Sequence, residues 1–558
     1  GGSGRPWPEE RRRILQLPGE IEPTMKIDRI ISGGRIIDGT GNPWRYGDVL
    51  ISGDKIVAIE PPGSVTDCDA ERIDATNHFV CPGFVDIQSH STLYLFRDGR
   101  SVSKVTQGVT TEIMGEVTTP APVGGQITDP LAGASMVPEE WRERARGWKS
   151  LADWLGAVEE AGVTPNIGSY IPGGMLRRYV KGMDQTAATP EELEEMKRIA
   201  AEAMESGAFG VSYALIYPLH CYASTEEVIE ISKVISRYNG HYVTHMRSEG
   251  DKILEALEEA MQIGREAGLP VEIYHLKVMG KESWHLMPEV IRRIERARAN
   301  GQDIAANMYP YEASGTSLTS CLPTWLGGGP QLYQRLQDPE IRRRIHEELR
   351  KGGREFLKGG EADEIMPIGF VLPQNKPYIG KRLSEIAEDR GTNPVDTIMD
   401  LLAEEKQPIN TIFFKMSEEN TALQIRQPWV KVSTDGRGTS PEYAGDGPIH
   451  PRGYGTYPRV FRRYVREQKI LIWEEAVRKM TSSVADRLRL RNRGRLESGY
   501  YADVVIFDPE TISDRATFEE PYQLSVGVRD VLINGQVVVR DGKHTGAKPG
   551  RFVRPGRL

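Results

Sequence analysis

The sequence predicts an α/β protein: a (β/α)8 TIM-like barrel joined to a small composite β-sandwich domain that is built from both ends of the chain. Two observations predict this fold class. Strand and helix patterns alternate through the centre of the chain, and eight strands with helical crossovers favour a barrel over a doubly wound sheet. Short alternating strands with glycine turns occur near both ends, outside this central part.

Composition indicates a globular protein with more than one structural unit. The chain has 558 residues, 39% hydrophobic and 27% charged, with a formal net charge of −8. This negative balance, without a basic domain, argues against nucleic-acid binding. No apolar run approaches the roughly 20 residues needed to cross a bilayer, so we expect no membrane association. Four scattered cysteines without CxxC spacing suggest a reducing compartment, and we expect a cytoplasmic protein.

The β-domain is expected to combine residues 26–82 with residues 485–545. Both segments carry short alternating apolar runs between glycine turns. Asn534-Gly535, between two apolar runs, is a strong signal for a two-residue β-hairpin. Residues 1–25 and 546–558 are interpreted as an N-terminal and a C-terminal tail.

The barrel is expected to span residues 83–484, with a largely helical insertion at about 322–425. Within the insertion, the apolar run at 411–414 could be a further strand, which leaves the strand count near the end of the barrel open. The candidate barrel strands are residues 83–90, 109–115, 165–171, 210–214, 241–245, 271–275, 303–309 and 429–435.

Two of these strands end in histidine. One ends at His245 and the next at His275, with a helical run over residues 251–268 between them. Because a long helical crossover connects parallel strands, both histidines are expected at the same C-terminal end of the barrel. Two imidazoles there can bind one metal ion. The alternative, that each is a hydrogen-bonded core histidine, stays open on these residues alone.

Other polar side chains follow further strand ends. Gln88 and His90 share one face at the end of the first strand, Glu116 follows the second strand, and Asp435 ends the last one. Arg452 lies beyond Asp435, within His-Pro-Arg. Together these residues would bring imidazole, amide, carboxylate and guanidinium groups to the mouth of one barrel.

Several longer runs carry a resemblance to a known family. They extend from about Ile27 to Arg551 and include PGFVDIQSHS, GVTTEIMGE, GAFGVSYALIYP, THMRSEGD, YHLK, STDG and HPRGYGTYPR. With these runs the chain resembles the amidohydrolase superfamily and, within it, the D-aminoacylase (N-acyl-D-amino-acid deacylase) family. PGFVD alone marks the superfamily, whereas THMRSEGD, YHLK and HPRxYGTYPR together are specific to the family.

The resemblance implies a metal-dependent hydrolase barrel with zinc at its C-terminal mouth. His245 and His275 match the histidines of the tight metal site, and Glu116 matches its third ligand if one gap is allowed. Otherwise Glu116 would be a solvated loop carboxylate. His90 matches a ligand of a second metal, but Gln88 stands where the family has another histidine. We therefore expect one tightly bound Zn²⁺ and a second site that is weak or absent.

The resemblance also implies hydrolysis of small N-acyl-D-amino acids to a carboxylate and a free amino acid, with zinc polarising the scissile carbonyl. Asp435 would act as general base to water and pass the proton to the leaving amine. Tyr217 would donate to the developing oxyanion, and Lys277 and Arg452 would bind the substrate carboxylate. His220 either faces the substrate or is an ordinary loop histidine.

Two other functions stay open. The departures at Gln88 and His220 alter the barrel mouth, so the substrate could be a dipeptide, a cyclic amide or an unusual N-acyl amide. The second alternative is not an enzyme: the protein could be a non-catalytic relative that has lost its metal. Measuring zinc per chain would distinguish this case from both enzymes. The acyl chain, the amino-acid side chain, the preference for D or L and the oligomeric state are not predicted.

Overall fold

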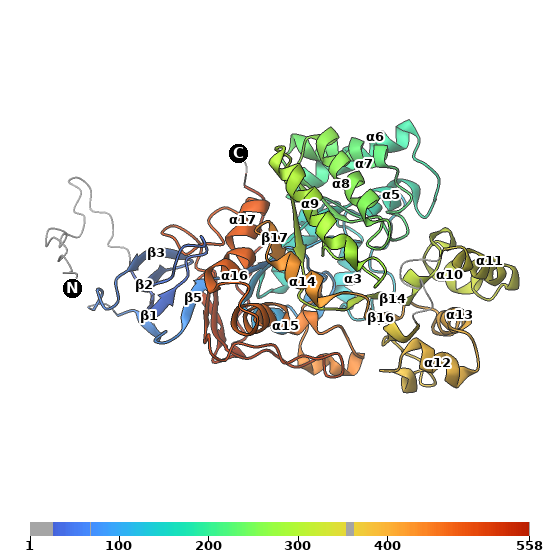
Figure 1. The fold of residues 1–558 in the computed structure, drawn as a ribbon. Helices are drawn as coiled ribbons and strands as arrows, with labels where there is room; N and C mark the ends of the chain where they lie inside the picture. Colours follow the sequence, from blue (N-terminus) through green and yellow to red (C-terminus); the bar gives the residue numbers. More distant parts are fainter. Residues whose placement is uncertain (1–25, 67–68, 353–361, 557–558) are drawn as a thin grey trace.

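The computed structural model describes residues 26–66, 69–352 and 362–556 (Figure 1). The predicted N-terminal tail lies outside the described residues, as do the last two residues of the predicted C-terminal tail.

Two parallel sheets form the centre of the molecule. One has six strands in the order β17-β13-β12-β11-β10-β9, and the other has three in the order β6-β7-β8. The predicted central strands are confirmed, although several of them are shorter than predicted. Their bounds are β6 Phe84–Asp86, β7 Val109–Met114, β8 Asn166–Ser169, β9 Ile171–Pro172, β10 Gly210–Ala214, β11 His241–His245, β12 Val271–Ile273, β13 Ile304–Met308 and β17 Val430–Val432.

The two parallel sheets are connected at both of their edges. Tyr170 alone separates β8 from β9 in the sequence, so these strands are two parts of one predicted strand. At the other edge Ser89 forms a parallel bridge with Gly436. There the Asp435 N–H also donates to the carbonyl oxygen of Gln88 at 3.0 Å. These contacts connect β8 to β9 and the residues after β6 to the residues after β17.

Several polar residues predicted to end strands lie beyond the hydrogen-bonded ladders. β6, β12 and β17 end before Gln88, His275 and Asp435, whereas His245 is the last residue of β11. His275 and Asp435 have left-handed backbone conformations, with φ of 33° and 47°. Such angles are uncommon for residues other than glycine and often occur at functional sites. The backbone turns at these two positions set the directions of both side chains.

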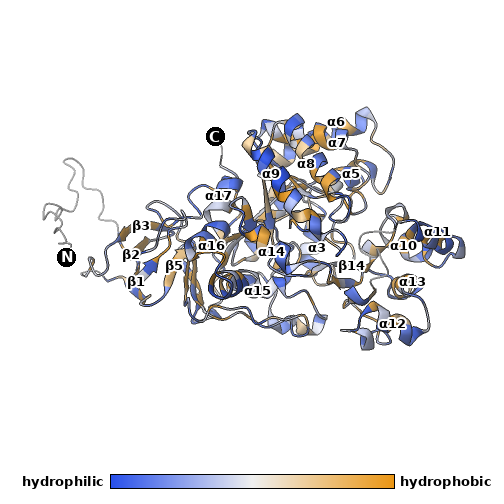
Figure 2. Cartoon of the chain, in the orientation of Figure 1, coloured by the Kyte–Doolittle hydropathy of each residue, from blue (hydrophilic) through white to orange (hydrophobic). Residues whose placement is uncertain are grey.

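Helices cover the outside of the parallel strands (Figure 1). α6 begins with a capping box between Thr189 and Glu192, and α8 ends at Gly268 in a left-handed conformation. Figure 2 colours these helices in both orange and blue, as expected of helices with one buried face. None of the described helices is both long and apolar enough to cross a membrane. The helices outside the segment between β13 and β17 are α1 Tyr94–Arg97, α2 Val102–Val105, α3 Glu139–Ala145, α4 Leu151–Ala161, α5 Gly173–Lys181, α6 Pro190–Glu205, α7 Thr225–Arg237, α8 Ile253–Ala267, α9 Met287–Ala299, α15 Arg452–Arg459, a π-helix Val460–Glu467, α16 Trp473–Met480 and α17 Ser482–Leu488.

Strands from both ends of the chain form one nine-stranded sheet. Its order is β21-β20-β19-β18-β5-β1-β2-β3, and β4 pairs with β1 as a branch. The antiparallel pairing of β5 with β18 joins the two ends of the chain. The predicted hairpin is confirmed: β19 and β20 are joined by Asn534 and Gly535, whose φ values are 48° and 77°. The bounds are β1 Arg29–Ile36, β2 Arg45–Ser52, β3 Lys55–Glu60, β4 Glu71–Asp74, β5 Phe79–Pro82, β18 Val504–Phe507, β19 Val528–Ile533, β20 Gln536–Arg540 and β21 Lys543–His544.

Strands from both chain ends form a β-domain, and its description as a β-sandwich stays a prediction. A continuous ladder joins the strands of both chain ends, so they make one branched sheet. The sheet packs around a core to which β1, β2 and β18 all contribute, including Ile31, Val49 and Val504. Because these side chains share one core, the two ends of the chain are tied together by packing as well as by hydrogen bonds.

The segment between β13 and β17 contains helices and a small antiparallel sheet of its own. The order of this sheet is β14-β16-β15, so the apolar run at 411–414 supplies a strand outside the parallel sheets. A hydrophobic cluster joins these helices to Ile216 and Met279, which follow β10 and β12. The segment therefore packs at the C-terminal ends of the parallel strands. Its elements are β14 Ser314–Ser317, α10 Pro330–Arg335, α11 Pro339–Arg350, β15 Ile365–Pro367, α12 Leu383–Arg390, α13 Pro394–Glu405, β16 Asn410–Phe413 and α14 Glu418–Ile425.

Candidate metal centre and active site

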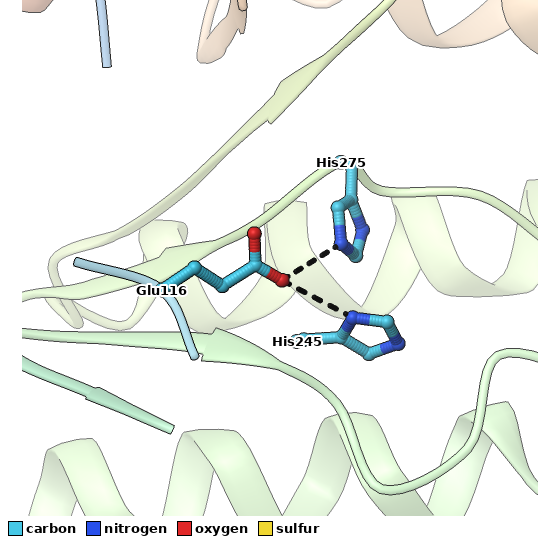
Figure 3. A group of neighbouring side chains, drawn as sticks. All are labelled: Glu116, His245 and His275. Carbon is cyan, nitrogen blue, oxygen red and sulfur yellow. Dashed lines mark hydrogen bonds and ion pairs between the residues drawn. The ribbon is translucent and has the colours of Figure 1, made fainter. Parts of the chain in front are cut away.

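Glu116, His245 and His275 come from the C-terminal ends of β7, β11 and β12 and point toward one another (Figure 3). Glu116 follows Gly115, whose φ is 95°. A Cβ atom at Gly115 would lie 2.3 Å from the carbonyl oxygen of Tyr170, so only glycine fits there. This close approach lets the chain turn at the end of β7 and directs Glu116 toward the two histidines.

The distances in this group match those of a zinc site. Glu116 Oε1 lies 3.3 Å from His245 Nδ1 and 3.4 Å from His275 Nε2. A tetrahedral zinc ion with bonds of about 2.0–2.2 Å holds its ligand atoms about 3.3–3.6 Å apart. All three side chains are buried. One carboxylate and two imidazoles leave a coordination position open, so the residues present fit the metal that the resemblance implies.

The far sides of both imidazoles face Glu249, which sequence analysis missed. Glu249 Oε2 lies 3.4 Å from His245 Nε2, and Glu249 Oε1 lies 3.1 Å from His275 Nδ1. Burial would raise the pKa of Glu249, but the charges of His245 and Lys277 outweigh it and hold the pKa well below its usual value. A carboxylate four residues after the first histidine, inside the matched run THMRSEGD, was the signal for this residue.

Lys277 contacts Glu249 and also lines the cavity at the metal centre. Its Nζ lies 2.7 Å from Glu249 Oε1 and 2.8 Å from His275 Nδ1, and the side chain is buried. The substrate-binding role of Lys277 stays a prediction: its ammonium has a buried carboxylate partner beside the metal centre, and the side chain also lines the cavity.

His90 and Asp435 lie on the other side of Glu116, together with Gln88. His90 Nε2 is 2.8 Å from Asp435 Oδ1 and 3.1 Å from Glu116 Oε2. The Gln88 amide donates to Glu116 Oε2 at 2.7 Å and to Asp435 Oδ1 at 3.1 Å. Burial would lower the pKa of His90, but hydrogen bonds to both carboxylates raise it to about 10. These residues form a second group that could hold a cation.

Asp435 also pairs with Arg452, the first residue of α15. Arg452 Nη1 lies 2.7 Å from Asp435 Oδ2, and Arg452 Nη2 donates to the carbonyl oxygen of Gly315 at 3.1 Å. The guanidinium lies over the ring of Tyr309, 4.7 Å from its centroid. Burial would raise the pKa of Asp435, but the charge of Arg452 outweighs it and the net shift is downward. Asp435 is therefore ionised at neutral pH and can accept a proton.

Tyr217 lies beside the metal centre. Its ring centroid is 5.1 Å from that of His245, and its hydroxyl hydrogen-bonds with Thr316 Oγ1 at 2.8 Å. Burial raises the pKa of Tyr217, so the hydroxyl keeps its proton and can donate a hydrogen bond. The oxyanion contact of Tyr217 stays a prediction.

His220 holds the loop backbone and does not line the cavity at the metal centre. The N–H groups of Gly174 and Ala214 donate to its Nδ1 at 3.3 and 3.1 Å. The opposite nitrogen, Nε2, therefore carries the proton and donates to the carbonyl oxygen of Val117 at 2.9 Å. Burial lowers the pKa of His220 to about 4. Of the two alternatives for His220, the structure supports the ordinary loop histidine, and the predicted substrate contact is corrected.

A cavity of about 610 Å³ opens from the metal centre toward the segment between β13 and β17. This volume falls within the range of small-molecule sites. Charged groups line it next to Glu116 and Asp435, whereas uncharged side chains line the part formed by that segment. The apolar lining residues include Ile216, Leu219, Leu322, Leu326, Leu332, Ile368, Ile412 and Ile449.

Known proteins share both the sequence and the fold. Two profiles of the amidohydrolase family match the chain, one over residues 79–318 and the other over residues 448–539. The D-aminoacylase of Alcaligenes xylosoxydans xylosoxydans is 34% identical over 94% of this chain and 97% of its own. The N-acyl-D-aspartate deacylase of the same organism is 33% identical over 95% of this chain and 96% of its own.

Solved structures agree with these relatives. A D-aminoacylase structure has a TM-score of 0.79 at 33% identity, covering 95% of this chain and 100% of its own. An N-acyl-D-glutamate deacylase from Bordetella bronchiseptica, in complex with zinc and a phosphonate that mimics the tetrahedral intermediate, has a TM-score of 0.78 at 28% identity and the same coverage. These likenesses support a TIM barrel with an attached β-domain.

The fold, the cavity and the buried metal-binding group together define a metal-dependent hydrolase of the amidohydrolase class. The extent of the sequence match then gives the family. The chain belongs to the D-aminoacylase family.

Proposed function

We propose that the protein hydrolyses N-acyl-D-amino acids to a carboxylate and a free D-amino acid, with one divalent metal ion held by Glu116, His245 and His275. The observation that carries the proposal is this buried group beside Asp435, in a cavity of small-molecule size. The family supports the substrate class, since its named relatives act on N-acyl-D-amino acids.

The reaction needs a base, an oxyanion donor and an anchor for the substrate. Zinc bound by the three ligands would supply a Lewis acid and lower the pKa of bound water. Asp435 accepts a proton from the water that attacks the acyl carbon and delivers it to the amine nitrogen as the C–N bond breaks. Tyr217 donates to the oxygen on which negative charge develops, and Arg452 binds the substrate carboxylate.

The finer organisation of the chain is part of this proposal. We assign the catalytic unit to a closed (β/α)8 barrel over residues 83–484, interrupted at about 322–425, and the composite β-domain to residues 26–82 and 485–545. Support comes from the contacts at both edges of the parallel sheets and from the pairing of β5 with β18.

Metal content tests the role of Gln88. The purified protein is expected to hold about one tightly bound zinc per chain, because the Gln88 amide donates to both Glu116 and Asp435 where a second cation would be held. The reversed amide would point its oxygen at two carboxylates, so the donor orientation is the favourable one. Gln88→His should bind a second zinc, measured by metal analysis after dialysis.

One solved D-aminoacylase structure concerns activation by one metal and attenuation by a second. Inhibition by excess zinc is therefore a second measurement in this experiment. Excess zinc should inhibit Gln88→His more than the original protein. Gln302→His is the control for a histidine gained elsewhere, because Gln302 precedes β13, at the end of the strand opposite the metal centre, and donates to the carbonyl oxygen of Met261. Two tightly bound ions in the unaltered protein would contradict the assignment.

The charges in the cavity predict an uncharged amino-acid side chain in the preferred substrate. Lys277 is paired with Glu249 and Arg452 with Asp435, and the part of the cavity formed by the segment between β13 and β17 is lined by uncharged side chains such as Leu322, Leu326 and Ile412. A second substrate carboxylate placed against those side chains would be desolvated without a cation beside it, which is unfavourable. We expect kcat/KM for N-acetyl-D-leucine to exceed that for N-acetyl-D-glutamate by at least about a hundredfold.

The same assay tests the function itself. N-acetyl-L-leucine and a cyclic amide such as dihydrouracil complete the substrate set, and product amine is measured at equal enzyme and zinc concentrations. The proposed function requires turnover of N-acetyl-D-leucine and little of the L form. Turnover of the cyclic amide alone would identify a different amidase, and no turnover by zinc-loaded protein would support a non-catalytic relative.

A further inference from the structure

We propose that Glu249 is a positioning residue that fixes the ring orientation and the tautomer of both metal-binding histidines. This inference rests on the metal centre of the proposed function and adds a residue to which no role has been assigned. Its two carboxylate oxygens face two different rings: Oε2 lies 3.4 Å from His245 Nε2, and Oε1 lies 3.1 Å from His275 Nδ1.

The two histidines present opposite nitrogens to the metal position. His245 turns Nδ1 toward Glu116, whereas His275 turns Nε2 toward it. A neutral imidazole that binds a metal through one nitrogen carries its proton on the other. His245 must then be protonated at Nε2 and His275 at Nδ1, and these are the two nitrogens that face Glu249.

A single carboxylate thus selects two different tautomers. An ionised carboxylate only accepts hydrogen bonds, so it stabilises each ring with the proton on the nitrogen nearest to it. In either histidine the opposite tautomer would point an N–H at the metal position and a lone pair at Glu249. An N–H at the metal position blocks coordination, and a lone pair facing a carboxylate is repelled by it. The Glu249 carboxylate therefore disfavours this tautomer in both histidines.

Lys277 completes this arrangement and keeps Glu249 charged. Its ammonium lies 2.7 Å from Glu249 Oε1, the same oxygen that faces His275. The ammonium also lies 2.8 Å from His275 Nδ1. Metal binding through Nε2 places a proton on that Nδ1, and the ammonium, which only donates, then directs its N–H bonds to Glu249 Oε1 and to the carbonyl oxygen of His275. The Met279 N–H also donates to the Glu249 carbonyl oxygen at 2.7 Å, which ties the loop after β12 to the loop after β11.

The burial of Glu249 strengthens its contacts with both imidazoles. Only 1% of the residue is exposed, and water competes little for its carboxylate at that depth. Outer carboxylates that orient metal-binding histidines typically change metal affinity by about 10–100-fold when they are replaced. Because this carboxylate serves two ligands, we expect an effect toward the upper end of that range.

Glu249→Gln tests the inference through metal binding, without substrate. Metal-free protein is titrated with zinc against a chromophoric chelator, and the expected result is a dissociation constant raised by about 10–100-fold. Cobalt(II) loaded into the same site provides a second readout, since its visible absorption reports ligand geometry. A glutamine amide can accept from one ring but must turn an N–H toward the other, so the spectrum should change as well.

Glu272→Gln is the matched control. Glu272, on β12, is also a fully buried carboxylate, but it is paired with Lys431 and Arg487. Its replacement should lower the unfolding midpoint while leaving zinc affinity within about twofold. Glu249→Asp serves if Glu249→Gln does not fold: it keeps the charge but shortens the reach, so zinc binding should still weaken.

The outcomes separate three cases. Unchanged zinc affinity in both Glu249 variants, or equal weakening in Glu249→Gln and Glu272→Gln, would overturn the positioning role. Failure of the unaltered protein to bind zinc would instead contradict the proposed function. Loss of affinity at Glu249 alone, with a changed cobalt spectrum, is the expected result.

Discussion

Replacing Asp435 with asparagine is expected to lower kcat by at least about a hundredfold, a typical minimum for the loss of general acid–base catalysis. Asparagine keeps the shape of the side chain but cannot accept the proton of the attacking water. Zinc should remain bound, because Asp435 is not one of the three groups in the Glu116, His245 and His275 cluster. The measurement is kcat together with zinc per chain in the same preparation.

Asp514→Asn is the control for this experiment. Asp514 is also a largely buried carboxylate, paired with Arg459 and Arg462, but it does not line the cavity. Its replacement should change stability and leave kcat within a few fold. Near-normal turnover of Asp435→Asn would exclude Asp435 as the proton acceptor, and a parallel loss of zinc would assign it to metal binding instead.

Replacing Arg452 with alanine is expected to reduce kcat/KM for N-acyl amino acids by roughly a hundredfold or more. A guanidinium offers two parallel donors to a carboxylate, and breaking such a desolvated pair leaves one charge unpaired. N-acyl amino acid amides, which lack the carboxylate, should lose much less. Both substrates must be assayed on both proteins, since Arg452 also contacts Asp435 and part of the loss can act through that contact.

Arg459→Ala is the control that distinguishes loss of substrate-carboxylate binding from destabilisation of α15. Arg459 lies on the same helix, its guanidinium lies over the ring of Tyr311 at 4.5 Å, and it pairs with Asp514. It resembles Arg452 in packing but not in its position at the cavity. Equal losses with acid and amide substrates in Arg452→Ala would mean that Arg452 supports Asp435 and does not bind the substrate carboxylate.

Local sequence patterns predicted the order of helices and strands better than they predicted which side chains contact one another. The central strands follow from apolar runs between helical segments, and Asn534-Gly535 specifies its hairpin by backbone conformation alone. His245 and His275 could be placed together because parallel strands align their ends. The composite β-domain was predicted from both chain ends, but the pairing of β5 with β18 was not, because pairing between distant segments leaves no local pattern.

The error at His220 has a physical cause. Its imidazole is suited to a substrate, but tertiary packing gives both ring nitrogens buried backbone partners first. Glu249 lies in an irregular loop, where no periodic pattern marks a buried side chain. The sequence lists the available groups, whereas their pairing depends on distances that form only in the folded chain.

The pairing of β5 with β18 affects the order of folding during synthesis. β5 leaves the ribosome early, but its antiparallel partner is made only after the whole barrel. At about 5–20 residues per second, the intervening segment takes on the order of half a minute to translate. Until then β5 has an unpaired edge that can bind other nascent strands. Efficient production should therefore depend on whatever protects this edge, and slower elongation near the end of the message should increase aggregation more than slower elongation at its start.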